Sequence, residues 1–236
     1  MTFFPDSQTY SGTYDFAPSG GEIIMNAYQR IKIRPTELLA THLQSAVMEL
    51  NLLLSRMSNL QPNLWTVDLQ SLPLTQGTAT YSLPAETVMI TNAYLSTGSG
   101  EDRVDRLIWP LSQTEYAAIS NKESQGTPTT FWFNRVISPT ITLYLTPDGN
   151  GPYTIYYYRV RQIQDATIAS GVNVEVPYLW LDALVAGLAH RLARLYAQEL
   201  EAIRKQDADE AWGIAATQNV ENVALNITPG LGGYFR

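Results

Sequence analysis

The sequence predicts an α+β protein in which helices near both ends of the chain form an antiparallel bundle and a large, mainly antiparallel β domain is inserted between them. Apolar residues recur at helical spacing in two separate parts of the 236-residue chain. Between them, residues 64–176 are rich in Thr, Tyr, Val, Ile and Trp and are punctuated by Pro and Gly. The expected divisions are an extended arm (1–20), the first part of the bundle (21–63), the β-rich insertion (64–176), one long C-terminal helix (177–221) and an extended tail (222–236).

The N-terminal part predicts two helices after the arm. Residues 23–33 form a short apolar run that Arg34 and Pro35 end, because the residue before a proline avoids helical backbone angles. Pro35 then suits the first position of a second helix of about six turns, which residues 59–62 end. One apolar stripe follows this helix: Leu39, Leu43, Ala46, Val47, Leu50, Leu53, Leu54 and Met57.

The central part predicts strands and one short helix. Five runs have strand composition, namely residues 78–83, 88–95, 130–137, 140–146 and 153–161. The Pro- and Gly-rich segment 147–152 predicts a hairpin between the last two runs. Ser112 with Glu115 three residues later has the spacing of a capping box, which predicts a short helix within residues 111–121.

From Pro177 the helical period returns. The stripe comprises Leu181, Leu184, Val185, Leu188, Leu192, Leu195 and Tyr196. We expect one helix that continues to about Asn219. Each helix has a single apolar stripe to bury, so packing the N- and C-terminal helices against each other is the economical arrangement.

The amino-acid composition excludes several common types of catalytic and metal site. The chain has no Cys and two His, which excludes disulfides, thiol nucleophiles, zinc ribbons and a three-His zinc site. It contains neither a phosphate-binding glycine loop nor a nucleophile elbow. His42 and His190 lie in predicted helices, where a structural or surface role is the ordinary interpretation. The sequence predicts no catalytic residue, metal or cofactor, and therefore no enzyme.

The charge balance argues against tight binding of nucleic acid. The net charge is −7, from 15 basic and 22 acidic residues, whereas duplex binding is dominated by Lys and Arg contacts to phosphate. No signal peptide and no apolar run of about 20 residues is found, so no membrane span is expected. Charged residues make up only 16% of the chain, which favours large buried interfaces.

Aromatic residues are concentrated in two places. The Tyr156–Tyr157–Tyr158 run favours a half-buried sheet or an interface over base stacking. Both predicted extended ends also carry apolar and aromatic residues. Two interpretations of these ends stay open, disorder in the isolated chain and ordering on a partner, and the two are compatible.

Several phrases together resemble a known family. Residues 106–116 read RLIWPLSQTEY, residues 126–129 read GTPT after an Asn–Lys pair at 121–122, and residues 143–145 read LYL ahead of a Pro–Asp pair at 147–148. Residues 176–184 read VPYLWLDAL. Together with the order of predicted elements, these phrases resemble the head-to-tail adaptor proteins of short-tailed bacteriophages, the group that includes tubular tail protein A. The resemblance covers the chain from about Ile23 to about Asn219.

The resemblance implies a virion protein that is made in the host cytoplasm and assembles into a dodecameric ring under the portal. Such a ring continues the DNA channel, and double-stranded DNA passes through without sequence-specific binding. The implied partners are the portal protein and the tail nozzle or fibre proteins. Portal contact is expected from tail residues Val223, Leu225, Ile227, Leu231, Tyr234, Phe235 and Arg236.

Two further sets of residues follow from this interpretation. Acidic helical residues are expected to line the channel, because they repel phosphate and let the duplex slide: Glu199, Glu201, Asp207, Asp209 and Glu210. Aromatic residues of the β domain are expected to contact neighbouring subunits, nozzle or fibres: Trp109, Tyr116, Trp132, Tyr144, Tyr156 and Tyr158. The alternative function is a nozzle or fibre-attachment binding module that forms no ring. A glycoside hydrolase would need a pair of carboxylates, for which the sequence has no marker.

Overall fold

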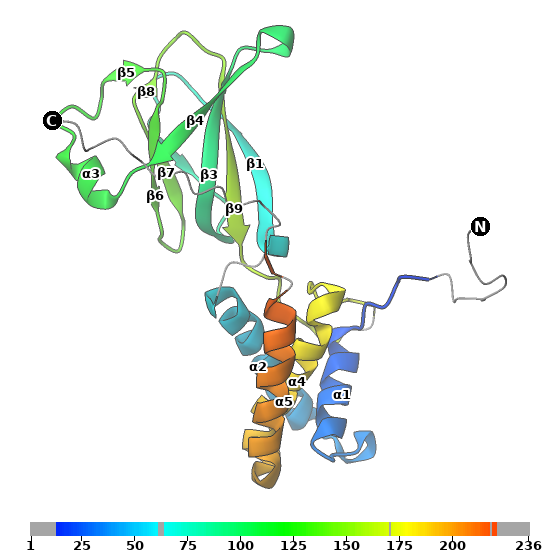
Figure 1. Cartoon of the computed structure of the whole chain (residues 1–236). Helices are drawn as coiled ribbons and strands as arrows, with labels where there is room; N and C mark the ends of the chain where they lie inside the picture. Colours follow the sequence, from blue (N-terminus) through cyan, green and yellow to red (C-terminus); the bar gives the residue numbers. More distant parts are fainter. Residues whose placement is uncertain (1–12, 61–63, 170, 218, 221–236) are drawn as a thin grey trace, which may run out of the picture.

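The structure, a computed structural model, describes residues 13–60, 64–169, 171–217 and 219–220. A helical unit lies below a β-rich unit in Figure 1, and each has its own hydrophobic core. The α+β class is therefore confirmed. The α-helices of the described residues are α1 (Gly20–Arg30), α2 (Ala40–Leu60), α3 (Gln113–Ala118), α4 (Leu181–Tyr196) and α5 (Glu201–Ala216). The strands are β1 (Val67–Pro73), β2 (Thr80–Ser82), β3 (Thr87–Thr97), β4 (Val104–Pro110), β5 (Gln125–Gly126), β6 (Thr130–Asn134), β7 (Thr140–Tyr144), β8 (Thr146–Pro147) and β9 (Tyr153–Arg161).

The helical unit is arranged around α4, which packs against α1, α2 and α5. A complete capping box starts α1, because Ser19 accepts from the Glu22 backbone and the Glu22 carboxylate accepts from the Ser19 backbone. The predicted start of the second helix at Pro35 is wrong. Pro35 opens a 3₁₀ turn that ends at Leu38 in an extended conformation, and α2 begins at Ala40. Leu39, the first residue of the predicted stripe, is consequently 63% exposed.

The prediction of a single long C-terminal helix is also wrong. Ala197 has φ −149° and ψ 62°, which ends α4, and a short 3₁₀ turn leads into α5. The chain reverses there, so that α5 lies beside α4 (Figure 1). This reversal buries Ala208 and Ala215 and brings the Trp212 ring to 4.9 Å from that of Trp180. A continuous helix would carry these apolar residues beyond the core.

The β-rich unit is built on a seven-stranded sheet with the order β1-β9-β3-β4-β6-β7-β2. All its strand pairs are antiparallel except β4 with β6. Each of the five predicted strand runs overlaps a strand, and the predicted short helix is α3, capped by Ser112. No prediction from the sequence covers β1 or β4, or the short β5 and β8 as separate strands.

The predicted hairpin between residues 140–146 and 153–161 is wrong. β7 pairs with β6 and β2, whereas β9 lies between β1 and β3. Both sides of β9 are therefore occupied, and no position beside it remains for β7. The segment between them instead contributes β8, which pairs with β5. A turn signal fixes a local reversal of the chain but does not decide which strands pair.

The two units meet at a polar junction. Arg159, at the end of β9, is only 6% exposed, and it donates to both carboxylate oxygens of Asp68 (2.8 and 3.2 Å) and to Glu86 (3.0 Å). Two residues further on, Arg161 forms a bidentate pair with Glu175 in the connection to α4. These pairs hold the end of the sheet against the segment that leads into the helices.

Candidate functional site

The most extended candidate surface is one face of the seven-stranded sheet. Successive residues of a strand point to opposite faces, and directly paired residues share a face. Trp109 is paired with Thr130, which is paired with Tyr144. Trp132, two residues after Thr130, therefore lies on that face as well. The register of β9 and β3 extends the same face to Tyr156 and Tyr158 through these pairs: Tyr94 with Leu107, Tyr94 with Tyr156, and Leu69 with Tyr158.

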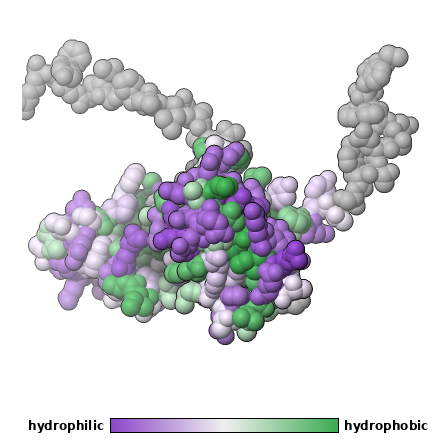
Figure 2. Space-filling model, turned by 90° about the horizontal axis from the view of Figure 1, so that it is seen from below, coloured by the Kyte–Doolittle hydropathy of each residue, from purple (hydrophilic) through white to green (hydrophobic). Residues whose placement is uncertain are grey.

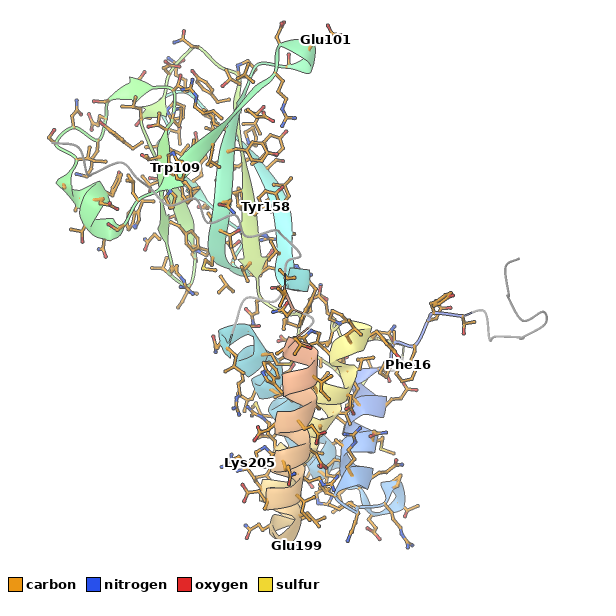
Figure 3. All side chains as sticks on the ribbon, viewed as in Figure 1. Phe16, Glu101, Trp109, Tyr158, Glu199 and Lys205 are labelled. Atoms are coloured by element: carbon orange, nitrogen blue, oxygen red, sulfur yellow. The ribbon has the colours of Figure 1, made fainter. Side chains whose placement is uncertain are left out.

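We call the exposed part of this surface the aromatic face, defined by Leu69, Tyr94, Leu107, Trp109, Tyr156 and Tyr158. Trp109 is 63% exposed and Tyr158 is 40% exposed, and Figure 3 labels both on the sheet. Leu107 and Leu69 are exposed to a similar extent, 48% and 44%. Several large apolar side chains that share one sheet face and remain exposed are typical of a binding surface.

In the middle of the aromatic face, two tyrosine rings stack on each other and an arginine side chain lies over one of them. The Tyr94 and Tyr156 rings stack at 5.1 Å with 9° between their planes. Arg103 lies over the Tyr156 ring at 4.8 Å and is held there by a bidentate pair with Asp105. The hydrogen bond from Arg103 lowers the pKa of the Asp105 carboxyl. The pair of Arg103 with Asp105 therefore positions a cation on an aromatic ring.

Tyr116 has a different setting from the other predicted aromatic residues. It lies on α3, where its ring stacks on Trp132 at 5.1 Å. Lys122 adds a cation 5.5 Å from the Tyr116 ring. Both aromatic rings are half-buried. The pair therefore fastens α3 to the sheet and is less available to a partner than Trp109.

Leu69, Tyr94 and Leu107 are not among the residues predicted from the sequence. Leu69 and Leu107 belong to β1 and β4, the two longer strands that the sequence does not predict. A weak signal exists in Val104, Arg106 and Ile108 alternating with Asp105, Leu107 and Trp109, but both sets mix apolar and charged residues. Only the pairing register shows that Leu107 joins the aromatic residues.

The five acidic residues predicted for the channel are spread over the surface of the helical unit. Glu199 lies in the turn between α4 and α5, at the free end of the unit (Figure 3). Glu201 and Asp209 line a groove between α5, α4 and α2. Asp207 and Glu210 line a separate hollow on the α1 side of α5. The five carboxylates therefore do not form a single stripe.

The remaining predicted residues fall into three settings. The portal-binding tail, Val223 to Arg236, lies outside the described residues. His42 packs beside the rings of Tyr28 and Tyr196, and its backbone carbonyl accepts from the Tyr28 hydroxyl at 2.7 Å. His190 lies 3.7 Å from a Glu201 carboxylate oxygen.

Two negative findings apply to residues 13–60, 64–169, 171–217 and 219–220. This part of the chain holds no group of three or more His, Asp or Glu side chains placed to bind a metal ion. None of its helices combines the length and apolar character needed to cross a membrane.

Comparison with known proteins now gives the class. The model of the SU10 adaptor protein family matches residues 21–227. The chain therefore belongs to the SU10 adaptor protein family. The sequence-based resemblance to adaptor proteins is confirmed at this level, and membership of the short-tailed phage group stays a prediction.

The other comparisons add little. No curated protein matches this chain. Twelve chains of solved structures do. One of them comes from a structure described as the neck of an empty GTA particle computed with C6 symmetry. It is 12% identical, with a TM-score of 0.26 over 72% of this chain and 76% of that one, a likeness too low to transfer detail.

Proposed function

We propose that this protein is a structural head-to-tail adaptor of a phage particle and has no catalytic role. The match to the adaptor family over residues 21–227 is the observation that carries the proposal. The exposed aromatic face supports it, because a protein whose work is assembly needs surfaces that other subunits cover. The low charged fraction of 16% supports it for the same reason.

In this proposal the chain forms a dodecameric ring under the portal of the virion. Its helical unit (residues 21–63 and 177–221) is an antiparallel bundle that faces the portal and the DNA channel. Its β domain (64–176) faces outward, where the aromatic face receives the tail nozzle or fibres. The tail (222–236) reaches the portal protein, and the arm (1–20) orders on assembly. Glu199, at the free end of the helical unit, is the strongest candidate for contact with the channel.

The proposal is tested by adding purified chain to isolated portal rings of the same phage. We expect a second ring of 12 copies beneath the portal, counted by native mass spectrometry and seen by electron microscopy. Deletion of residues 223–236 is expected to abolish docking, and a Gly/Ser segment of equal length in their place is expected not to restore it. Wild-type chain that never associates with portal would contradict the adaptor assignment.

The alternative is a nozzle or fibre-attachment module that forms no ring. The exposure of Trp109 and Tyr158 favours it, because aromatic faces suit both sugar and protein ligands. Adding nozzle or fibre proteins to the mixture of chain and portal rings distinguishes the two functions. A chain that binds nozzle or fibre proteins as a monomer and ignores portal supports the alternative.

A further inference from the structure

The helical unit carries a groove whose lining is rich in cations. The groove lies between α2, α4 and α5 and has a volume of about 520 Å³. Its lining includes four cationic side chains, Arg56, Arg191, Arg194 and Lys205, against two carboxylates, Glu201 and Asp209. Arg191 is paired with Glu49 at 2.9 Å. Arg56 and Lys205 form no ion pair or hydrogen bond with any described residue, so they are free to meet a partner.

Beside the groove, α2 presents an apolar stripe to solvent. Met48, Leu52 and Leu60 are 62%, 47% and 54% exposed, and with Arg56 they follow the spacing i, i+4, i+8 and i+12. Each member of this series lies about one turn from the next, so the stripe winds around α2 by about 120° from Met48 to Leu60. We call the stripe and the cationic groove together the groove face. It combines apolar contact area with unpaired positive charge.

The opposite side of α5 has the reverse charge. Ile203, Asp207, Glu210 and Ile214 follow the spacing i, i+4, i+7 and i+11, and the two isoleucines are 52% and 65% exposed. A hollow between this side and α1 is lined by three carboxylates, Asp182, Asp207 and Glu210, against one guanidinium, Arg30. Asp182 is paired with Arg30 and Asp207 with Arg204. We call this surface the acidic face.

The two faces lie on different sides of the unit. At 3.6 residues per turn, Lys205 and Glu210 project roughly 140° apart around α5. Lys205 lines the groove shared with α2, whereas Glu210 borders the hollow on the α1 side. Seen from the free end of the helical unit, hydrophobic side chains also reach the surface between hydrophilic ones (Figure 2). Neither face is covered within the described part of the chain.

We propose that the acidic face of one copy of this chain packs against the groove face of the next copy. The charges are complementary, and each face combines exposed aliphatic side chains with charged ones. The two stripes also match in length, about 16 Å from Ile203 to Ile214 and about 18 Å from Met48 to Leu60 at 1.5 Å per residue. A contact between two different faces repeats from copy to copy and generates a ring or a filament.

A second copy explains more of the surface than duplex DNA does. DNA would use only the groove face, against Glu201 and Asp209 in the same groove, and would leave the acidic face and its exposed isoleucines without a partner. The inference rests on the proposed function for the ring, and it adds which two surfaces join neighbouring subunits.

Charge exchange tests the contact. Variant A carries Arg56→Glu and Lys205→Glu, and variant B carries Asp182→Lys and Glu210→Lys. Each variant alone opposes like charges, and we expect at least about a tenfold loss of self-association. Mixing A with B restores opposite charges at every contact and is expected to restore assembly, as is combining all four changes in one chain. Assembly is measured by sedimentation velocity without portal and by counting copies on portal.

Matched controls test whether a change in net charge or a loss of folding, and not the contact itself, accounts for the effect. Arg106→Glu with Arg135→Glu, and Glu101→Lys with Glu123→Lys, reverse the same charges on exposed positions of the β-rich unit. These controls are expected to assemble as wild type. Circular dichroism shows whether each variant is folded. The inference is overturned if variants A and B assemble as well as wild type, or if their mixture fails to assemble. It is also overturned if variant A no longer retains DNA and mixing with variant B does not restore assembly.

Cysteine cross-linking gives a second measurement that does not depend on charge. The chain has no native Cys, so the background is clean. Under oxidation, Leu52→Cys mixed with Ile214→Cys is expected to give cross-linked dimers, and a chain with both changes to give a ladder of oligomers. Dimers of either single variant alone contradict a contact between different faces. If the chain self-associates through these faces but does not bind portal, the adaptor function is refuted and the contact is supported. If the chain docks on portal but gives no cross-links, the adaptor function is supported and the contact is refuted.

Discussion

At the scale of single residues, the best-connected charge of the described chain is Arg159. Its guanidinium holds Asp68 and Glu86 at the end of the sheet and also donates to the Thr87 hydroxyl at 3.1 Å. Hydrogen bonding from Arg159 keeps the pKa of the Asp68 carboxyl below its ordinary value of 3.8. Hydrogen bonding from Arg161 likewise lowers the pKa of Glu175 from 4.5.

These shifts predict how stability depends on pH. A carboxyl whose pKa is lower in the folded state contributes stability above its unfolded pKa, and this is lost as pH falls through the folded pKa. We therefore expect the free energy of unfolding to fall as pH decreases below about 4.5. Arg159→Met is expected to cost about 2 kcal/mol near pH 7, because it removes the charged hydrogen bonds from a buried guanidinium to two partly exposed carboxylates, and to flatten the acid dependence. Urea unfolding measured from pH 3 to 7 checks both effects.

Arg135→Met is the matched control for this experiment. Arg135 is exposed, and its side chain forms no hydrogen bond or ion pair with described residues. Its change is expected to alter stability by no more than about 0.5 kcal/mol. An Arg159 variant with wild-type stability and an unchanged pH profile would show that the junction network contributes nothing. The sequence does not predict this network, because its members come from four separate segments.

At the scale of elements, the reversal at Ala197 is the main departure from the sequence-based expectation. The apolar stripes from Leu39 to Met57 and from Leu181 to Tyr196 are strong, and a helix lies over most of each, α2 and α4. The break between α4 and α5 carries neither Pro nor Gly. Chain propensity therefore gives no stop signal, and burial of the second half against the core decides the turn.

The docking of α5 predicts a local effect of Trp212→Ala. The Trp212 ring contacts Trp180, which in turn lies 5.1 Å from Trp65. Removing the half-buried indole is expected to cost about 2–3 kcal/mol, somewhat less than for a fully buried one. Hydrogen exchange should then increase in residues 201–216 and stay unchanged in the sheet. Gln206→Ala, at an exposed position of the same helix, is the control, and equal exchange in the two variants would contradict docking through Trp212.

At the scale of the whole molecule, two separate cores support two kinds of surface. The helical unit presents faces of opposite charge, and the β-rich unit presents an aromatic face. A subunit in a ring needs two unlike contacts to its neighbours and additional surface for other proteins. Because the surfaces belong to different units, the aromatic face can be changed by mutation without altering the faces of the helical unit.

Trp109→Ser with Tyr158→Ser tests that independence. Both side chains are exposed, so we expect a change in stability of no more than about 0.5 kcal/mol and normal assembly on portal. Binding of tail nozzle or fibre protein, measured by co-sedimentation with the assembled ring, is expected to be lost. Ile137→Ser removes an apolar side chain that is 95% exposed at the β6–β7 turn and serves as control. Unchanged nozzle and fibre binding in the double variant would exclude the aromatic face as their site.

Sequence alone determined the α+β class, the helical stripes, five of the strands, the α3 cap and the resemblance to adaptor proteins. These features depend on residues close together in the chain, whose spacing is visible without the fold. Tertiary structure decided the reversal at Ala197, the neighbours of β9, the junction around Arg159 and the union of Leu69, Tyr94 and Leu107 with the predicted aromatic residues. Each of these depends on which distant segments pack or pair, and that choice follows from burying the cores as a whole.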